Sequence, residues 1–222
     1  MLLYKVLSKL STNETYKKNM LGAKKGIDFE NNLLSEIVND GEYISYSNAA
    51  LKKHKNFKEF KKILTDGLND NVYIETDLLN DICDSPRVIY QPLGKQSSPD
   101  ILFIRKNKVL ALECKFTAKQ IKAPVWNSGL PKLSFNYIFG SLQLSDVTFF
   151  SGSKILEKLE RNQILSLVSE KRKELKIEGL QITSKFEIYL RPMYNQKENS
   201  WTSLNRTVYE NSLIEECKKF ES

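Results

Sequence analysis

The chain has a single histidine, His54, among its 222 residues. Catalytic centres that combine several histidines, either as a base with a second histidine or as paired metal ligands, are therefore excluded. His54 lies in a lysine-rich stretch of helical character, and we expect it to be a solvated surface residue. An enzyme built on this chain must instead use carboxylates, lysines and, where a metal takes part, one that prefers oxygen ligands.

Cysteine is also scarce, with only Cys83, Cys114 and Cys217, all far apart. This spacing excludes a disulfide framework and a cysteine-based zinc site, and it indicates a reducing compartment. No apolar run approaches the ~18 residues of a membrane span. The first residues, 1–18, are too interrupted by lysine for a signal peptide. We therefore expect a cytoplasmic protein that does not contact a membrane.

Positive charge exceeds negative charge, since 34 Lys plus Arg oppose 27 Asp plus Glu and leave a net charge of +7. A basic protein suits a polyanionic partner, although composition alone identifies none. The charge is unevenly placed: residues 51–62 contain six lysines and one glutamate, whereas 65–86 contain six acidic residues and no basic one. Two interpretations remain open. In the first, both segments are solvated helix faces. In the second, the lysine run faces phosphates and the acidic run lies on the far side of the protein.

The length and the ordinary globular composition favour a single domain over residues 1–222. Hydrophobic periodicity predicts helices over 26–38, 57–64, 77–83, 153–175 and 208–220, and strands over 88–91, 100–105, 108–116, 137–139, 147–150 and 185–190. The helix at 153–175 is expected to be amphipathic, with Ser153 as its N-cap. Helices on both sides of a central mixed sheet make an α/β fold.

A glutamate and a lysine separated by one residue occur four times in the chain, at Glu59/Lys61, Glu113/Lys115, Glu174/Lys176 and Glu216/Lys218. Three of these triplets lie in polar helical stretches and are expected to be surface charge. Only Glu113-Cys114-Lys115 interrupts an apolar strand, VLALECKF. Charges in such a strand are costly to desolvate unless they are paired or bind a metal, so this triplet is a candidate site.

The register of the two strands decides what lies beside this triplet. If Lys106-Asn107 is a two-residue turn, Asp100 faces Glu113, and Lys115 lies on the same sheet face. Opposed carboxylates repel unless a cation lies between them, and Mg²⁺ with oxygen ligands suits that position. A three-residue turn would instead put the two carboxylates on opposite faces. Cys114 points away from them, where a small thiol suits a core.

The order Pro99-Asp100, twelve intervening residues, then Glu113-Cys114-Lys115 resembles the PD-(D/E)xK nuclease signature, on the strand hairpin which that superfamily uses. Pro-Asp occurs nowhere else in the chain. The resemblance implies a restriction-endonuclease-like fold with an αβββαβ core, a central mixed sheet flanked by helices, and a catalytic core over about residues 26–190. One departure is visible, because residues 117–134 look like a loop where the family has a helix.

The resemblance also implies roles for individual residues. Asp100 and Glu113 would hold Mg²⁺ together with the backbone carbonyl of Cys114, and Lys115 would orient the attacking water and offset phosphate charge. Glu30, in the first helix of the implied core, would assist at the metal, and its alternative is an ordinary surface glutamate. A bound metal lowers the pKa of water and stabilises charge that develops on a phosphodiester, so no histidine is needed.

The stretch after the triplet contains further candidates. Lys119 and Lys122 follow the catalytic strand, and with Lys95 they are candidate phosphate contacts. The sequence WNSGLP resembles loops of small type II restriction endonucleases. Asn127 suits an adenine edge and Trp126 suits stacking on a base. The alternative is a turn in which Trp126 is a buried anchor.

Taken together, the resemblance implies a Mg²⁺-dependent type II restriction endonuclease that cuts double-stranded DNA at a short specific sequence. It would act as a homodimer, because two strands need two active sites, and it would have a companion DNA methyltransferase in the same system. Two alternatives remain: a repair or junction-resolving nuclease of the same fold, and a DNA-binding module that has lost its activity.

Overall fold

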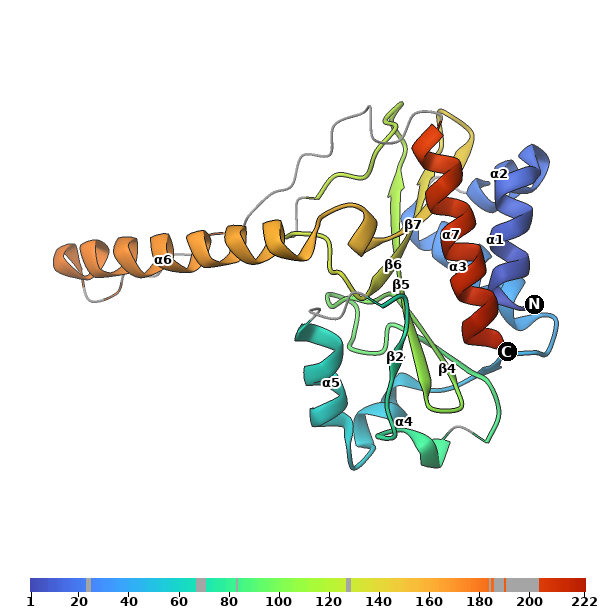
Figure 1. Ribbon diagram of the computed structural model, residues 1–222, viewed down its shortest axis with the longest axis horizontal. Coiled ribbons are helices and arrows are strands. Elements are labelled where there is room, and N and C mark those ends of the chain that lie inside the picture. The colour runs from blue at the N-terminus through green and yellow to red at the C-terminus, as the bar shows by residue number, and fades with distance from the viewer. Residues whose placement is uncertain are drawn as a thin grey trace.

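Seven strands form one mixed β-sheet in the part of the chain that the computed structural model describes, residues 1–22, 25–66, 71–82, 84–126, 129–183, 185, 190 and 204–222 (Figure 1). They are β1 (Ile44–Ser45), β2 (Ile74–Glu75), β3 (Arg87–Tyr90), β4 (Ile101–Arg105), β5 (Lys108–Thr117), β6 (Phe135–Ser141) and β7 (Asp146–Ser151). Their order is β1-β3-β4-β5-β6-β7, with β2 paired to the start of β5. β3, β4 and β5 are antiparallel, whereas β5 and β6 are parallel. The predicted α/β class is confirmed.

Helices cover both faces of this sheet. One face carries α1 (Leu3–Thr12), α2 (Glu14–Leu21), α3 (Gly26–Val38) and α7 (Leu204–Glu221). The other carries α4 (Asn48–Lys53) and α5 (Phe57–Asp66). Two short 3₁₀ turns are η1 (Asn80–Ile82) and η2 (Gly152–Lys154). The long helix α6 (Lys158–Ile182) follows η2 along the chain. Because α1 and α7 pack on the same face, the helical layer includes residues outside the predicted core of about 26–190.

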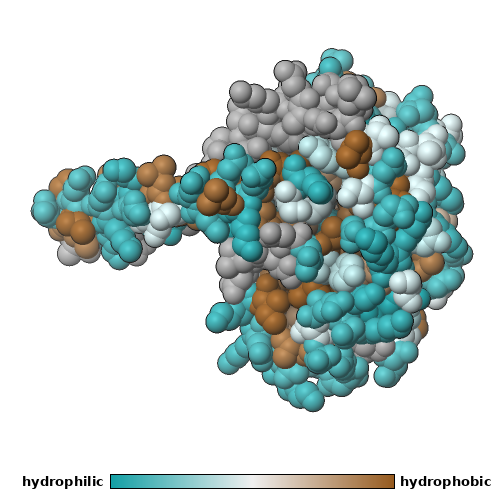
Figure 2. Space-filling model, viewed as in Figure 1, coloured by the Kyte–Doolittle hydropathy of each residue, from teal (hydrophilic) through white to brown (hydrophobic). Residues whose placement is uncertain are grey.

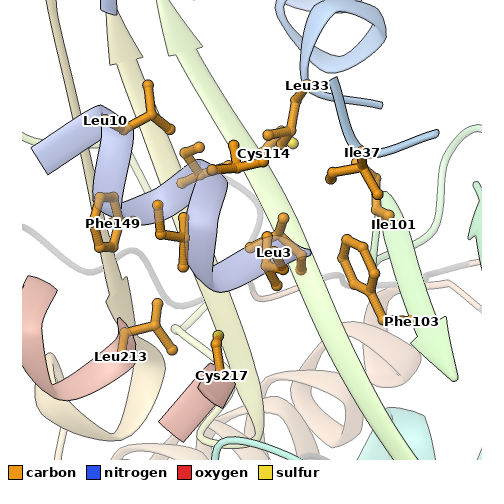
Figure 3. Packing of buried hydrophobic residues seen from close by; sticks show 14 of the residues in the cluster. Leu3, Leu10, Leu33, Ile37, Ile101, Phe103, Cys114, Phe149, Leu213 and Cys217 are labelled. Atoms are coloured by element: carbon orange, nitrogen blue, oxygen red, sulfur yellow. The ribbon is translucent and has the colours of Figure 1, made fainter. Parts of the chain in front are cut away.

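The core is divided between these two faces. Figure 3 shows Cys114 pointing into the first cluster, where Leu3, Leu33 and Leu213 come from α1, α3 and α7. The second cluster packs Leu51, Phe60 and other α4–α5 residues against the opposite side of β4, β5 and β6. β4 and most of β5 are buried on both faces, which explains why ILFI and VLALEC are nearly continuous apolar runs.

The register of the β4–β5 hairpin agrees with the two-residue turn predicted at Lys106-Asn107. Ile101 is paired with Leu112 and Ile104 with Val109. Lys106 has a φ of 54°, the left-handed conformation that tight hairpin turns require. The side chains of Glu113 and Lys115 therefore lie on the face that carries α4 and α5, opposite to Cys114.

Most of the predicted elements are found within a few residues of their expected bounds, but one predicted helix is wrong and further helices were not predicted. The helix expected over 77–83 is only the turn η1. The strand expected over 185–190 lies outside the described residues, apart from Lys185 and Leu190. The helices α1 and α2 were not predicted, although Leu3, Val6, Leu7 and Leu10 recur at helical spacing.

The long helix also differs from its prediction. Ser153 lies in η2, and α6 begins at Lys158, after the N-cap residue Glu157. α6 extends away from the sheet (Figure 1), and Figure 2 shows hydrophobic residues scattered among hydrophilic ones along it. Leu159 and Leu167 are more than half exposed. The expected apolar side is therefore not packed on the core, because only Arg161 and Gly179 of this helix are buried.

His54 is not the solvated residue that its lysine-rich surroundings predicted. Its side chain is only 7% exposed. Nδ1 accepts a hydrogen bond from the backbone N–H of Asn56, so the ring N–H is at Nε2, and it donates a hydrogen bond of 2.7 Å to Asp81 Oδ1. His54 thus joins α4 to η1, and its role in the described structure is a structural contact.

Two further observations concern the helices and the cysteines. Within the described residues, no helix has both the length and the apolar character needed to cross a membrane. Cys114 and Cys217 are buried free thiols, and Cys83 lies outside the described residues.

Candidate active site

Asp100 lies immediately before β4 and is held against β5. Its backbone carbonyl accepts a hydrogen bond of 2.7 Å from the backbone N–H of Gln91, which extends the β3–β4 pairing beyond Tyr90 and Ile101. Its side-chain Oδ2 accepts a second bond, of 2.8 Å, from the backbone N–H of Cys114. The carboxylate of Asp100 is therefore fixed next to the Glu113-Cys114-Lys115 triplet.

Glu113 and Lys115 form an ion pair on the face of β5 that carries α4 and α5. Lys115 Nζ lies 2.8 Å from Glu113 Oε1, and the two side chains are 22% and 10% exposed. The other carboxylate oxygen, Glu113 Oε2, is buried and has no hydrogen-bond partner among the described residues. A buried acceptor without a partner costs free energy, and such an atom in a native site is often completed by an ion, water or ligand.

Glu30 reaches the same end of the sheet from α3, on the opposite side. Tyr90, the last residue of β3, donates a hydrogen bond of 2.8 Å from its hydroxyl to Glu30 Oε2. The side chain of Gln91 donates a bond of 3.1 Å to that hydroxyl oxygen. Burial raises the pKa of Glu30, Tyr90 opposes that shift, and the charge of Glu113 adds to it. Glu30 is thus a positioned residue near the carboxylate pair.

The electrostatics of the site are dominated by burial and by repulsion between carboxylates. Burial, followed by the charges of Glu113 and Glu30, raises the pKa of Asp100 to about 7. The Cys114 N–H and Lys115 act in the opposite direction but do not cancel the effect. Burial, followed by the charges of Asp100, Glu30 and Glu113, raises the pKa of the Cys114 thiol, which stays protonated. Three acids facing one lysine leave an excess of negative charge that a cation would relieve.

The oxygen atoms at this position suit Mg²⁺. In the described part of the chain, no cluster of three or more His, Cys, Asp and Glu side chains is arranged for a metal. Mg²⁺ does not need such a cage, since it commonly binds one or two carboxylates and keeps waters or substrate oxygens as its other ligands. Asp100 and Glu113, with its orphan Oε2, provide two carboxylates, and the carbonyl of Cys114 is a third candidate oxygen.

The three lysines predicted to contact phosphate are all exposed. Lys95 lies in the loop between β3 and Asp100, and Lys119 is the second residue after β5. Lys122 lines a separate surface hollow of about 630 Å³ together with Phe139 and Arg206. The structure thus leaves all three ammonium groups accessible, but of the residues predicted from the sequence it gathers only the carboxylates and Lys115 at one point.

Trp126 is buried, with 4% of its surface exposed. Its ring packs edge-on against Tyr137, with centroids 4.8 Å apart, and also against Phe150. This packing favours the anchor alternative over base stacking. Asn127 lies outside the described residues. The loop character predicted for 117–134 agrees with the described residues there, which contain no helix between β5 and β6.

Sequence reasoning missed three polar residues around the site. Tyr90 and Gln91 were detectable in principle, because pairing of β3 with β4 sets them opposite Ile101 and Asp100. The third is Lys132, whose Nζ lies 4.4 Å from the centre of the Phe135 ring. Burial lowers the pKa of Lys132 while the charge of Glu113 raises it, so the two side chains interact. Its position directly before an apolar strand was the only available signal.

Comparisons of this chain with protein-family models, curated proteins and solved structures give no match. The resemblance to PD-(D/E)xK nucleases therefore depends on the motif and on the geometry described above.

Proposed function

We propose that the protein is a Mg²⁺-dependent endonuclease that hydrolyses phosphodiester bonds of double-stranded DNA. The observation that carries the proposal is the juxtaposition of Asp100, directly before β4, with Glu113 and Lys115 of the adjacent strand β5. Two carboxylates and a lysine at one point, in a partly buried position, suit metal-assisted phosphodiester hydrolysis without a histidine base.

Each residue has a distinct part in this chemistry. Asp100, Glu113 and the backbone carbonyl of Cys114 would hold Mg²⁺, which when bound lowers the pKa of a water molecule and stabilises charge on the phosphate oxygens. Lys115 donates hydrogen bonds from Nζ, so it can orient the attacking water and offset the charge that develops on the phosphate. Glu30, fixed by Tyr90, adds negative charge that strengthens cation binding.

The finer assignment is to a type II restriction endonuclease that acts as a homodimer and has a companion DNA methyltransferase. It is supported by the resemblance of the motif and by the net charge of +7, which suits a polyanionic substrate. A twofold-symmetric dimer would present one active site to each DNA strand.

Incubation of the purified protein with plasmid DNA and Mg²⁺ tests this assignment. A restriction enzyme gives discrete fragments whose ends map to one short sequence, and EDTA abolishes this cleavage. A smear or a preference for branched DNA indicates a repair or junction-resolving nuclease. DNA binding without cleavage in any divalent metal indicates an inactive module and refutes the enzymatic proposal.

A further inference from the structure

We propose that the lysines of α4, of α5 and of the turn between them form a second, phosphate-binding surface for duplex DNA beside the candidate active site. The choice of DNA as the polyanion rests on the proposed function. The surface consists of six lysines, Lys52, Lys53, Lys55, Lys58, Lys61 and Lys62. All six are exposed, and among the side chains that the structure describes only Lys55 has a carboxylate within 4.0 Å, that of Asp81.

The packing of the two helices explains why these lysines face outward. Leu51 of α4 and Phe60 and Leu64 of α5 are fully buried in the core cluster on one face of the sheet. Lys58, Lys61 and Lys62 have the i, i+3 and i+4 spacing that places side chains on one side of a helix, opposite to Phe60 and Leu64. In Figure 2, hydrophilic residues follow the outer edge of this region. The three ammonium groups thus form a compact cationic face.

The surface lies on the same side of the sheet as Glu113 and Lys115 and is connected closely to Asp100. Asn48, the first residue of α4, donates a hydrogen bond of 3.2 Å to the carbonyl of Gln91. The N–H of Gln91 in turn donates to the carbonyl of Asp100. Gln91 therefore links the start of α4 to the backbone of Asp100 through two hydrogen bonds.

Lys52 extends the positive charge toward the active site. It lies one helical turn after Asn48, and its Nζ is 3.5 Å from the position that a Cβ would take at Gly94. Gly94 and the exposed Lys95 belong to the loop that leads from β3 to Asp100. Positive charge therefore runs from α5 through Lys52 to that loop, as a backbone-tracking surface requires.

The chemistry favours the phosphate backbone as the partner. Clustered ammonium groups repel one another, and a row of phosphates relieves that repulsion while it releases the counterions condensed on DNA. Such contacts carry no sequence information; they add affinity and fix the orientation of the duplex relative to the active site. The second interpretation of the lysine run, contact with phosphates, is thus the one that the position of α4 and α5 supports.

The test is the salt dependence of binding to a short DNA duplex, measured in EDTA so that no cleavage occurs. The triple variant Lys58→Gln, Lys61→Gln and Lys62→Gln is compared with Lys5→Gln, Lys9→Gln and Lys18→Gln, which removes the same charge from exposed positions of α1 and α2 on the opposite face. Each lost phosphate contact should flatten the plot of log K against log salt concentration by ~0.9. For the α5 variant we expect the slope to become shallower by about two to three and binding to weaken at least roughly tenfold. For the control variant we expect little change in either quantity.

Equal slopes for the α5 variant and the wild type overturn the surface, and so does an equal reduction by the control variant, which would reflect net charge alone. Thermal unfolding of both variants must match the wild type, as expected for exposed Lys→Gln changes. A wild type that binds through α5 but never cleaves with Mg²⁺ leaves the surface standing and refutes the nuclease. Cleavage of DNA with Mg²⁺, combined with an unchanged salt slope for the α5 variant, overturns the surface and leaves the nuclease proposal standing.

Discussion

The backbone N–H of Cys114 donates a hydrogen bond of 2.8 Å to Oδ2 of Asp100. This one bond joins the start of β4 to the second half of β5 and sets the carboxylate of Asp100 beside that of Glu113. The side chain of Cys114 meanwhile belongs to the core cluster on the opposite face. A shift of the hairpin by one residue would break this arrangement, since it would exchange the core face and the site face of β5.

Replacing Lys115 tests the chemistry of the candidate site. Lys115→Ala removes the ammonium 2.8 Å from Glu113 Oε1 and should lower plasmid cleavage by at least about 10²-fold, the loss typical of one transition-state donor. DNA binding should change little. The matched control is Lys176→Ala, in another Glu-x-Lys triplet on the exposed surface of α6. Cleavage by Lys115→Ala at the wild-type rate would contradict the assignment.

Asp100 should make the metal-free protein less stable as the pH rises. Its pKa is raised to about 7 in the folded state, from an ordinary value of 3.8, so the folded state retains a proton that the unfolded chain has lost. Between these two values each rise in pH disfavours folding. Asp100→Asn keeps an acceptor for the Cys114 N–H but removes the titration. We expect the variant to be about 2–4 kcal/mol more stable than the wild type near pH 8, and the difference to fall below about 1 kcal/mol near pH 4.

The measurement is denaturant unfolding in EDTA at both pH values. A second arm adds Mg²⁺ near pH 8, where it should stabilise the wild type and leave Asp100→Asn unchanged, because a ligand stabilises the state that binds it. A pH-independent difference between the two proteins would show that the Asp100 carboxyl is not titrating in the range expected from its burial.

The hairpin and its charged residues were predictable because their determinants are local. A two-residue turn and the alternation of VLALECK fix which side chains share a face, and the pairing of Ile101 with Leu112 follows. The partners of Glu30 were not predictable, because Tyr90 lies 60 residues away and meets it only through packing of α3 on the sheet.

The same distinction, between local determinants and contacts distant in the sequence, explains the predictions that were wrong. The apolar residues of α6 have roughly helical spacing, but periodicity does not say whether another element lies against them, and Leu159 is 67% exposed. His54 was expected in solvent because its neighbours in sequence are lysines. Its burial depends on Asp81, 27 residues further along the chain.

Trp126 provides a test of the loop between β5 and β6. Because its indole is buried against Tyr137 and Phe150, Trp126→Ala should lower the free energy of unfolding by about 3–5 kcal/mol. Trp126→Phe retains an aromatic ring and should lower it by less. Both are measured by denaturant unfolding. Weaker DNA binding by Trp126→Ala with unchanged stability would instead support the stacking role predicted from the sequence.

Glu221 should stabilise the helical layer over a long distance in sequence. Its carboxylate accepts hydrogen bonds from the N–H groups of Leu3 and Tyr4, at 2.7 and 3.0 Å, and from the hydroxyl of Tyr43 at 2.7 Å. It therefore caps the first turn of α1 from the end of α7. Glu221→Ala leaves three donors without an acceptor and should lower the free energy of unfolding by about 2–4 kcal/mol. Glu215→Ala, which removes only an exposed pair with Lys218, should change it by less than about 0.5 kcal/mol. Equal effects of the two variants in denaturant unfolding would rule out this role for Glu221.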